Sequence, residues 1–365
     1  MIDEPRGMWY SGRYGDCSPA AQEAFSKWAQ ERGCPEAAAD GIPPRGRTMA
    51  FYRFYQFRLD SVPRFVRAAM ADTPAAEVPA MPGNGNAGPE QMNHSCYWPP
   101  AIARHGMIAA TWAYDSPASC KMYAETLRTA EEFGGQSYIV PPLYSEAQTA
   151  LEEIPKTAAC TSALNTKVCP WHFAAPVTGP NRVDWMKTVY LGARLTHATS
   201  GLQHVPPLYV WCPESIVYND LVEMSSEEAG NWRRTWQSLF DANADYAVTC
   251  ALKIPAGAKL LWSCARPVLT EEEFAVLRGF VDAGGTLLCA FEADPELPDG
   301  SPLTGFADLP TERVRRIALT PEALAAAADG PERNLPVTDA SVKTFIYRRD
   351  GKRVHLLNNN SLEQA

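Results

Sequence analysis

Acidic side chains stand at the ends of three short apolar stretches of the sequence. Asp3 and Glu4 lie in the opening "MIDEPRGMWY", Asp115 closes "HGMIAATWAYD", and Glu146 follows "QSYIVPPLYS". Carboxyl groups that act in pairs carry out general acid–base and nucleophilic chemistry. Structural roles are equally open. Asp3 and Glu4 can be a solvated pair, Asp115 a helix N-cap, and Glu146 an acid in a first helical turn, which the helix dipole favours.

Aromatic residues and one histidine lie near the same stretches. They are Trp9, Trp112, Tyr114, Tyr144, Trp171 and His172. Aromatic rings stack on the faces of sugars, an imidazole can bond a hydroxyl, and ligand pockets combine such rings with a few polar groups. Each residue alone is more often a packing residue. As a group at the ends of strand-like stretches, they favour a sugar-binding cleft.

Composition excludes several classes of protein. The chain has 365 residues, 46% of them hydrophobic and 21% charged, which is typical of a globular protein of two or three domains. Its net charge of −9 disfavours binding to nucleic acid, since phosphates require an excess of Lys and Arg. No apolar run reaches the ~18 residues of a membrane span, and no signal peptide is visible. The ten cysteines are scattered without a CxxC pair, so we expect no metal site and no cofactor.

The first 200 residues alternate between strand-like and helix-like patterns. Apolar stretches end near residues 81, 115, 144 and 173, a step of roughly 30 residues that suits one βα unit each. Between them, residues 117–135 form the clearest helical pattern and residues 145–164 a weaker one. Such units predict a parallel sheet with functional groups at the carboxyl ends of its strands.

An insertion separates the opening residues from the next strand. Residues 18–33 read as a helix with a Ser N-cap, residues 49–72 read as an aromatic-rich helix, and "MPGNGNAG" reads as a turn around Asn84. If "MIDEP" ends a strand, five strand ends precede residue 200. Five strands are too few to close an eight-stranded barrel.

The second half predicts a separate α/β domain. Three stretches have the pattern of strands: "VPPLYVWCPES", "AKLLWSCA" and "TLLCAFE". Two segments have the pattern of capped helices, residues 225–243 and 269–285. Near the C-terminus, Asp350-Gly351 stands between two alternating stretches, which is a strong hairpin signal.

Several motifs along the chain resemble the family 42 β-galactosidases and related retaining glycosidases. They are "IDEPRGM", "ALNTKVCPWHFAAPVTGP" with "VDWMKTVYLGARLT", and "LTEEEFAVLRGFVDAGGTLL". The resemblance implies an α/β fold class in three parts. Residues 1–203 would form a partial (β/α)8 TIM barrel of about strands 4–8. Residues 204–310 would form a non-catalytic flavodoxin or class I amidotransferase-like domain, and residues 311–365 a truncated β domain. The chain is therefore expected to begin at the fourth strand and to be incomplete for activity.

The resemblance also implies catalytic roles. Glu4 would be the acid/base at the end of the fourth strand, and Asp3 would stand where these enzymes usually carry Asn. The nucleophile would follow the seventh strand, placed at residues 137–143, which makes Glu146 the candidate and Asp115 the alternative. Retaining enzymes hold the two carboxyl groups about 5–5.5 Å apart. The substrate would be a β-galactoside or related β-glycoside bound by the aromatic residues above, and a homotrimer is expected from relatives.

Two other interpretations stay open. The chain can be a carbohydrate-binding or scaffold protein that keeps the glycosidase fold without the reaction. Glutamine amidotransfer is disfavoured, because Cys264 in "WSCARPVLTEEE" lacks the glycine-flanked turn such a nucleophile needs and no His follows until His355.

Overall fold

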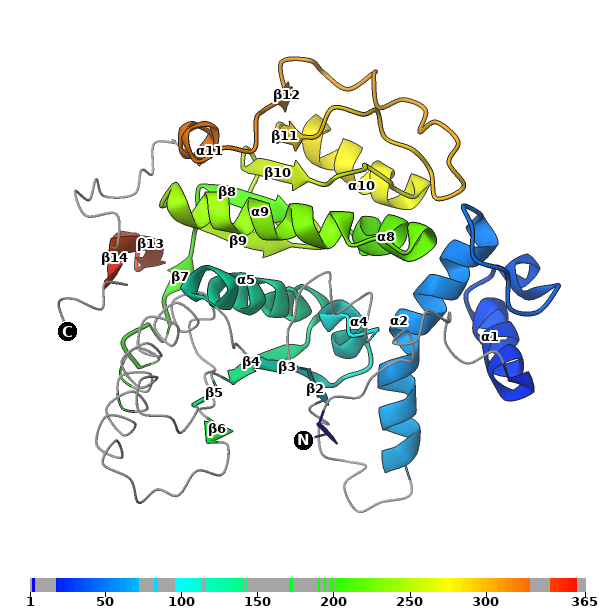
Figure 1. The fold of residues 1–365 in the computed structure, drawn as a ribbon. Coiled ribbons are helices and arrows are strands. Elements are labelled where there is room, and N and C mark those ends of the chain that lie inside the picture. The colour runs from blue at the N-terminus through cyan, green and yellow to red at the C-terminus, as the bar shows by residue number, and fades with distance from the viewer. Residues whose placement is uncertain are drawn as a thin grey trace.

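The computed structural model describes residues 2–3, 18–71, 82–84, 96–112, 116–140, 142–143, 171–172, 190, 194, 197–199, 201–328 and 342–359. It shows a mixed α/β protein with two parallel sheets one above the other and helices between and around them (Figure 1). The predicted mixed α/β class with parallel sheets is confirmed.

The first parallel sheet comes from the N-terminal third of the chain. It has four strands in chain order, namely β1 (Ile2–Asp3), β2 (Pro82–Asn84), β3 (Ile108–Trp112) and β4 (Gln136–Val140). A separate parallel pair follows, formed by β5 (Pro142–Leu143) and β6 (Trp171–His172). Parallel pairing throughout is consistent with a partial TIM-barrel glycosidase fold.

A strand lies where the sequence predicted a turn. Pro82–Asn84 is the strand β2, whereas the apolar stretch ending near residue 81 lies outside the described residues. This short strand pairs with β1 on one side and β3 on the other. Backbone hydrogen bonding to two neighbours overrides the low strand preference of Gly and Asn, since strand preference depends strongly on context.

Helices surround this sheet. They are α1 (Pro19–Glu31), α2 (Met49–Met70), α4 (Pro99–Arg104) and α5 (Pro117–Arg128), with the 3₁₀ turns η1 (Pro35–Ala38) and η2 (Thr129–Phe133). Among them, α1, α2 and α5 lie where the sequence predicted helices. Ser18 and Thr48 cap α1 and α2, because each hydroxyl accepts a backbone N–H three residues on. The second weak helical pattern, residues 145–164, lies outside the described residues.

The second parallel sheet has five strands. Its strands are β8 (Leu208–Trp211), β9 (Tyr246–Thr249), β10 (Lys259–Ser263), β11 (Thr286–Ala290) and β12 (Val314–Arg316), in the spatial order β12-β11-β10-β8-β9. Numbered within the sheet this is 2-1-3-4-5, the order of flavodoxin-like sheets. The sheet therefore extends beyond the expected boundary at residue 310, to Arg316.

The helices of the second sheet are η3 (Glu214–Val217), α8 (Tyr218–Glu223), α9 (Glu227–Asp241), α10 (Glu271–Asp282) and α11 (Pro321–Ala328). The helix α9 begins as predicted, but its N-cap Ser226 makes no side-chain cap bond. Instead the Asp220 carboxylate accepts the N–H groups of Glu228 and Ala229. A side chain from the preceding helix thus accepts hydrogen bonds from the backbone N–H groups of the first turn of α9.

The C-terminal hairpin predicted around Asp350-Gly351 is confirmed. β13 (Val342–Arg349) and β14 (Lys352–Asn359) pair antiparallel, and β7 (Gln203–His204) adds a third strand to β13. His204, at the start of the second half of the chain, therefore pairs with the C-terminal hairpin.

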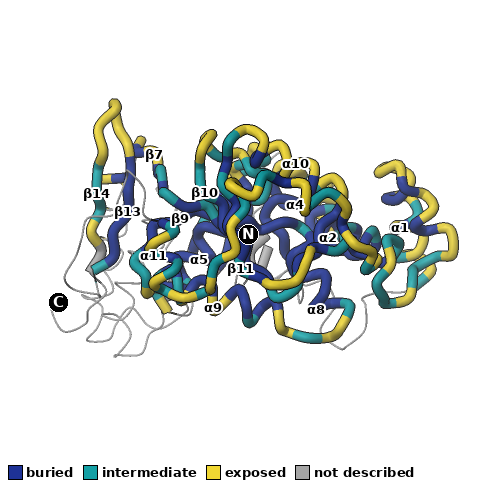
Figure 2. Tube along the Cα trace, turned by 90° about the horizontal axis from the view of Figure 1, so that it is seen from above, coloured by how far each residue is buried: buried dark blue, intermediate teal, exposed yellow. Residues whose placement is uncertain are grey.

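One hydrophobic core runs through both parallel sheets. It contains Phe25 and Trp28 from α1, Phe54 from α2, Leu127 from α5 and Tyr246 from β9. The helix α5 lies between the two sheets and contacts β3 and β4 on one side and β9 on the other (Figure 1). Figure 2 shows the buried residues gathered through the middle of the molecule, with exposed residues along α10 and the outer loops. Both halves of the chain therefore share a packed interior.

The start of α10 allows a test of local stability. Thr270 and Glu273 form a reciprocal capping box, with Thr270 Oγ1 accepting the Glu273 N–H at 3.1 Å and the Glu273 carboxylate accepting the Thr270 N–H at 2.9 Å. We expect Thr270→Ala to lower the free energy of unfolding by about 1 kcal/mol in urea titrations. Ser226→Ala is the matched control and should change it little. Equal losses in both variants would contradict the capping account.

Candidate functional site

The carboxyl ends of the first sheet lie at one edge. The register aligns Asp3 with Gly83, Gly83 with Ala110, and Ala110 with Tyr138. Two residues further along, Trp112 at the end of β3 aligns with Val140 at the end of β4. In parallel α/β folds this edge carries the functional groups. The edge is therefore the candidate active site.

Strand spacing sets how such an edge can bring two acids together. Neighbouring strands lie about 4.8 Å apart, so β1 and β4, three spacings apart, have ends about 14 Å apart in a flat sheet. Retaining glycosidases need carboxyl groups about 5–5.5 Å apart. In a barrel, curvature of the sheet and the reach of two facing side chains shorten such a distance.

Of the predicted residues, two lie at this edge, two lie in the separate β5–β6 pair, and the others lie outside the described residues. Asp3 ends β1, Trp112 ends β3, and Trp171 and His172 form β6, each described by its backbone alone. The other predicted residues lie outside the described residues; they are Glu4, Trp9, Tyr114, Asp115, Tyr144 and Glu146. Their roles stay predictions.

A buried charged cluster supports α5, the helix that follows β3. Asp245 accepts from His204 Nε2 at 3.0 Å and lies 3.4 Å from Lys121 Nζ, while Glu125 pairs with Arg128 at 2.7 Å. Asp245 and Glu125 are fully buried. Burial alone would raise the pKa of Asp245, but the charges of His204 and Lys121 outweigh it and hold that pKa below its ordinary value.

Asp245 also accepts the backbone N–H of Ile346 at 2.8 Å, which ties the C-terminal hairpin to the same point. One carboxylate thus joins α5, β7 and β13. No sequence motif marks this cluster. The spacing of Lys121 and Glu125, one helical turn apart inside an apolar pattern, was the available signal.

A second buried acid holds the helices behind the sheet. Asp60 on α2 accepts from Trp28 Nε1 at 3.0 Å, from Arg64 Nε at 3.0 Å and from His105 Nε2 at 2.8 Å. Burial alone would raise the pKa of Asp60, but the hydrogen bonds from His105, Arg64 and Trp28 hold it well below its ordinary value. Asp60 therefore fixes α1, α2 and the loop before β3 to one another.

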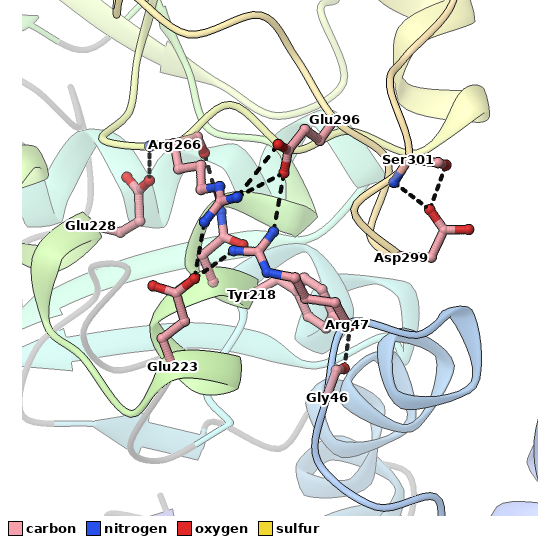
Figure 3. A network of polar contacts seen from close by, with 10 residues as sticks. Gly46, Arg47, Tyr218, Glu223, Glu228, Arg266, Glu296, Asp299 and Ser301 are labelled. Atoms are coloured by element: carbon pink, nitrogen blue, oxygen red, sulfur yellow. Dashed lines mark hydrogen bonds and ion pairs between the residues drawn. The ribbon is translucent and has the colours of Figure 1, made fainter.

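Figure 3 shows a network of ion pairs that joins the insertion to the second sheet. Arg47 and Arg266 each contact both Glu223 and Glu296. Arg47 precedes α2, whereas Arg266 follows β10. The four side chains are partly exposed, so each pair contributes little alone. Their alternating arrangement orients the insertion on the second half of the chain.

The second sheet carries one thiol that the sequence analysis considered as a nucleophile. Cys264 directly follows β10 and is 4% exposed. Burial, and then the neighbouring Glu228 carboxylate, raise the pKa of the Cys264 thiol well above its ordinary value. Because a nucleophilic cysteine must be a thiolate, this setting opposes amidotransferase chemistry.

Glu228 itself predicts a pH dependence of stability. Burial raises its pKa from 4.5 to about 8, although its carboxylate accepts the N–H groups of Ala265 and Arg266. Between pH 4.5 and about 8 the folded chain keeps a proton that the unfolded chain has released, so stability falls as pH rises through this window.

The melting temperature of the wild type should fall between pH 5 and pH 8, a window set by the raised pKa of Glu228. We expect this fall to be smaller in Glu228→Gln. Melting curves at a series of pH values measure this loss. The exposed neighbour Glu227→Gln is the control and should keep the wild-type slope. A variant curve parallel to that of the wild type would contradict the assignment.

The described residues give no sign of a metal centre or membrane span. Across the described ranges, no three His, Cys, Asp or Glu side chains are grouped to hold a metal ion. Among those same ranges, no helix has the length and apolar character needed to cross a membrane.

Solved structures with similar folds are glycoside hydrolases. The exo-carrageenase from Bacteroides ovatus matches with a TM-score of 0.63 and 11% identity, over 94% of this chain and 57% of that chain. The β-galactosidase from Rahnella sp. R3 matches with a TM-score of 0.56 and 14% identity, over 81% of this chain and 52% of that chain.

The chain has a family 42 β-galactosidase-like fold. A rhamnosidase from Novosphingobium sp. PP1Y also matches, with a TM-score of 0.53 and 15% identity, over 94% of this chain and 38% of that chain. No family model and no curated protein sequence matches. The chain spans about half the length of the family 42 structures, and at this identity the likeness shows the fold alone.

Proposed function

We propose that the chain is part of a retaining glycoside hydrolase that acts on a β-galactoside or a related β-glycoside. One observation carries the proposal. In a fold similar to solved glycoside hydrolases, the parallel register sets Asp3, directly before Glu4, at the same edge as Trp112. An acid and an aromatic residue at one sheet edge suit the cleavage of a glycosidic bond.

The proposed mechanism is a double displacement. Glu4 donates a proton to the glycosidic oxygen as the bond to the anomeric carbon breaks, while the Glu146 carboxylate forms an ester with that carbon. Glu4, now ionised, then takes a proton from water, which attacks the anomeric carbon and releases Glu146. Asp115 is the alternative nucleophile. The proposed first step requires Glu4 to carry a proton when the substrate binds.

The substrate would be held by the aromatic side chains of the edge. The side chains proposed to stack on sugar rings are Trp9, Trp112, Tyr114, Tyr144 and Trp171. His172 and Asp3 are proposed to form hydrogen bonds with hydroxyl groups of the sugar. The homotrimer expected from relatives and the non-catalytic role of the second α/β part are proposed with it.

A second candidate is a carbohydrate-binding or scaffold protein that keeps this fold without the reaction. The residue favouring it is Asp3, which stands where the family usually carries Asn, so the contact made by that amide is changed. Turnover separates the two candidates.

The experiment is an assay with nitrophenyl glycosides on the longest natural reading frame that contains these 365 residues. The proposal expects hydrolysis of a β-glycoside with retention, seen by proton NMR as the β anomer of the first-formed sugar. The 365-residue chain alone is proposed to be poorly active. A first product of inverted configuration, or no turnover of any β-glycoside by the protein assayed, would contradict the proposal.

A further inference from the structure

A polar cavity lies on the side of the molecule away from the candidate active site. Its volume is about 220 Å³, and it is lined chiefly by Arg32, Arg53, Gln56, Asp60, Arg104 and Glu214. Trp28 of α1 forms part of its wall. The walls thus come from α1, α2, α4 and the segment that follows β8.

The cavity stands at the point where the second sheet reverses its strand order. From β8 the chain goes to β9 on one side, and β10, β11 and β12 follow on the other. Open α/β sheets bind ligands in the crevice outside the carboxyl ends of the two strands that flank such a reversal. Glu214 follows β8, and Glu272, a further wall residue, lies in the first turn of the helix after β10. Topology and the cavity therefore indicate the same place.

The charges in the cavity balance. Arg32 pairs with Asp60 at 3.6 Å, Arg53 with Glu272 at 3.7 Å, and Arg104 with Glu214 at 3.3 Å. The two longer distances exceed hydrogen-bond range. These two guanidinium groups can therefore donate to a ligand without breaking a hydrogen bond to their partner carboxylates.

The side chains in the cavity wall indicate which class of ligand it can bind. Three carboxylates beside three guanidinium groups disfavour a free anion, because it would be repelled by the acids as much as attracted by the bases. A polyol suits them better, since a hydroxyl can both donate to a carboxylate such as Glu272 and accept from the Arg32 or Arg53 guanidinium. Asp60 already accepts three hydrogen bonds. The Gln56 amide already bonds Arg53 and Glu214. A volume of about 220 Å³ fits one sugar ring.

We propose that this cavity binds a monosaccharide at a site separate from the candidate active site. Arg104 lies before the amino end of β3, whereas the candidate active site lies at its carboxyl end, at Trp112. The two sites face opposite edges of the first sheet. The proposal stands on the cavity alone and does not require the chain to be a hydrolase.

The test is calorimetric titration of the full chain with D-galactose, D-glucose and L-rhamnose in turn. We expect saturable binding of at least one sugar, weakened about tenfold or more in Arg53→Ala and in Arg32→Ala, because each variant loses charged hydrogen bonds to the ligand. Arg313→Ala removes an exposed arginine elsewhere and should leave the affinity unchanged. Thermal melting confirms that the variants are folded.

A variant of the other edge separates this site from the candidate active site. Trp112→Ala should not change the sugar affinity measured here. No saturation with any of the three sugars would overturn the proposal, and so would binding that Trp112→Ala weakens but Arg53→Ala does not. Titration with inorganic phosphate completes the test, since phosphate binding lost in Arg53→Ala without any sugar binding would show that the ligand class is wrong.

Discussion

Replacing Glu4 with Gln is expected to lower kcat on a nitrophenyl β-glycoside by about 10²–10⁴-fold, the usual contribution of a general acid–base group. The amide has the shape of the carboxyl group but neither gives nor takes a proton. The loss should appear mainly in the second step, since nitrophenolate leaves without much protonation, whereas the attacking water needs a base. Steady-state kinetics on the longest natural reading frame measures the effect.

Two further variants test whether this loss comes from the acid–base role of Glu4. In Glu4→Ala, added azide should restore turnover and yield a glycosyl azide, because azide attacks the anomeric carbon without help from a base. Asp3→Asn is the matched control; it supplies the amide usual at this position of the family, and we expect kcat to be kept or raised. Full activity of Glu4→Gln would rule out the role of Glu4.

Asp245→Ala is expected to lower the free energy of unfolding by about 3–5 kcal/mol, the usual cost of removing one partner of a buried ion pair. The substitution leaves Lys121 and His204 buried without their shared carboxylate and removes the acceptor for the Ile346 N–H. Burial already lowers the pKa of Lys121, so this lysine should lose its proton more readily in the variant. Urea titration followed by circular dichroism measures the loss.

The control for this prediction is Asp294→Ala. Asp294 pairs with Arg316 at 3.1 Å, but its side chain is 91% exposed, so the variant should lose well under 1 kcal/mol. If Asp245→Ala and Asp294→Ala were equally stable, the buried cluster would not hold α5, β7 and β13 together.

The sequence predicted best where one local pattern decides the structure. The capped helices that became α1 and α10, and the hairpin at Asp350-Gly351, each depend on residues within a few positions of one another. The end of α10 is also decided locally. Gly284 follows the helix with a φ of +95°. A Cβ on the next residue, Gly285, would lie 2.2 Å from the Phe280 ring. Local sterics alone end the helix here.

Prediction failed where distant residues decide. The strand Pro82–Asn84 exists because β1 and β3 flank it, which no local preference of Pro, Gly or Asn reveals. The cap of α9 comes from Asp220 rather than Ser226. The partners of Asp60 and Asp245 lie up to 124 positions away, as Lys121 does from Asp245. Packing of separate elements creates these contacts, so periodicity cannot show them.

The candidate active site was predicted through a family resemblance, and the fold agrees with that resemblance. The residues themselves indicated less: the repeated βα pattern predicted a parallel sheet, and the structure supplies the register that places Asp3 and Trp112 at one edge. Pairing between individual acids was not readable, because the distance between two carboxyl groups depends on the curvature of the sheet rather than on their spacing in the chain.

Trapping of the covalent intermediate tests the central claim most directly. The longest natural reading frame is incubated with 2-deoxy-2-fluoro-β-galactosyl fluoride, which slows hydrolysis of the ester, and its peptides are then analysed by mass spectrometry. We predict one sugar bound as an ester to Glu146, or to Asp115 if that residue is the nucleophile. A protein that turns over β-galactosides yet carries no sugar on either acid would contradict the account.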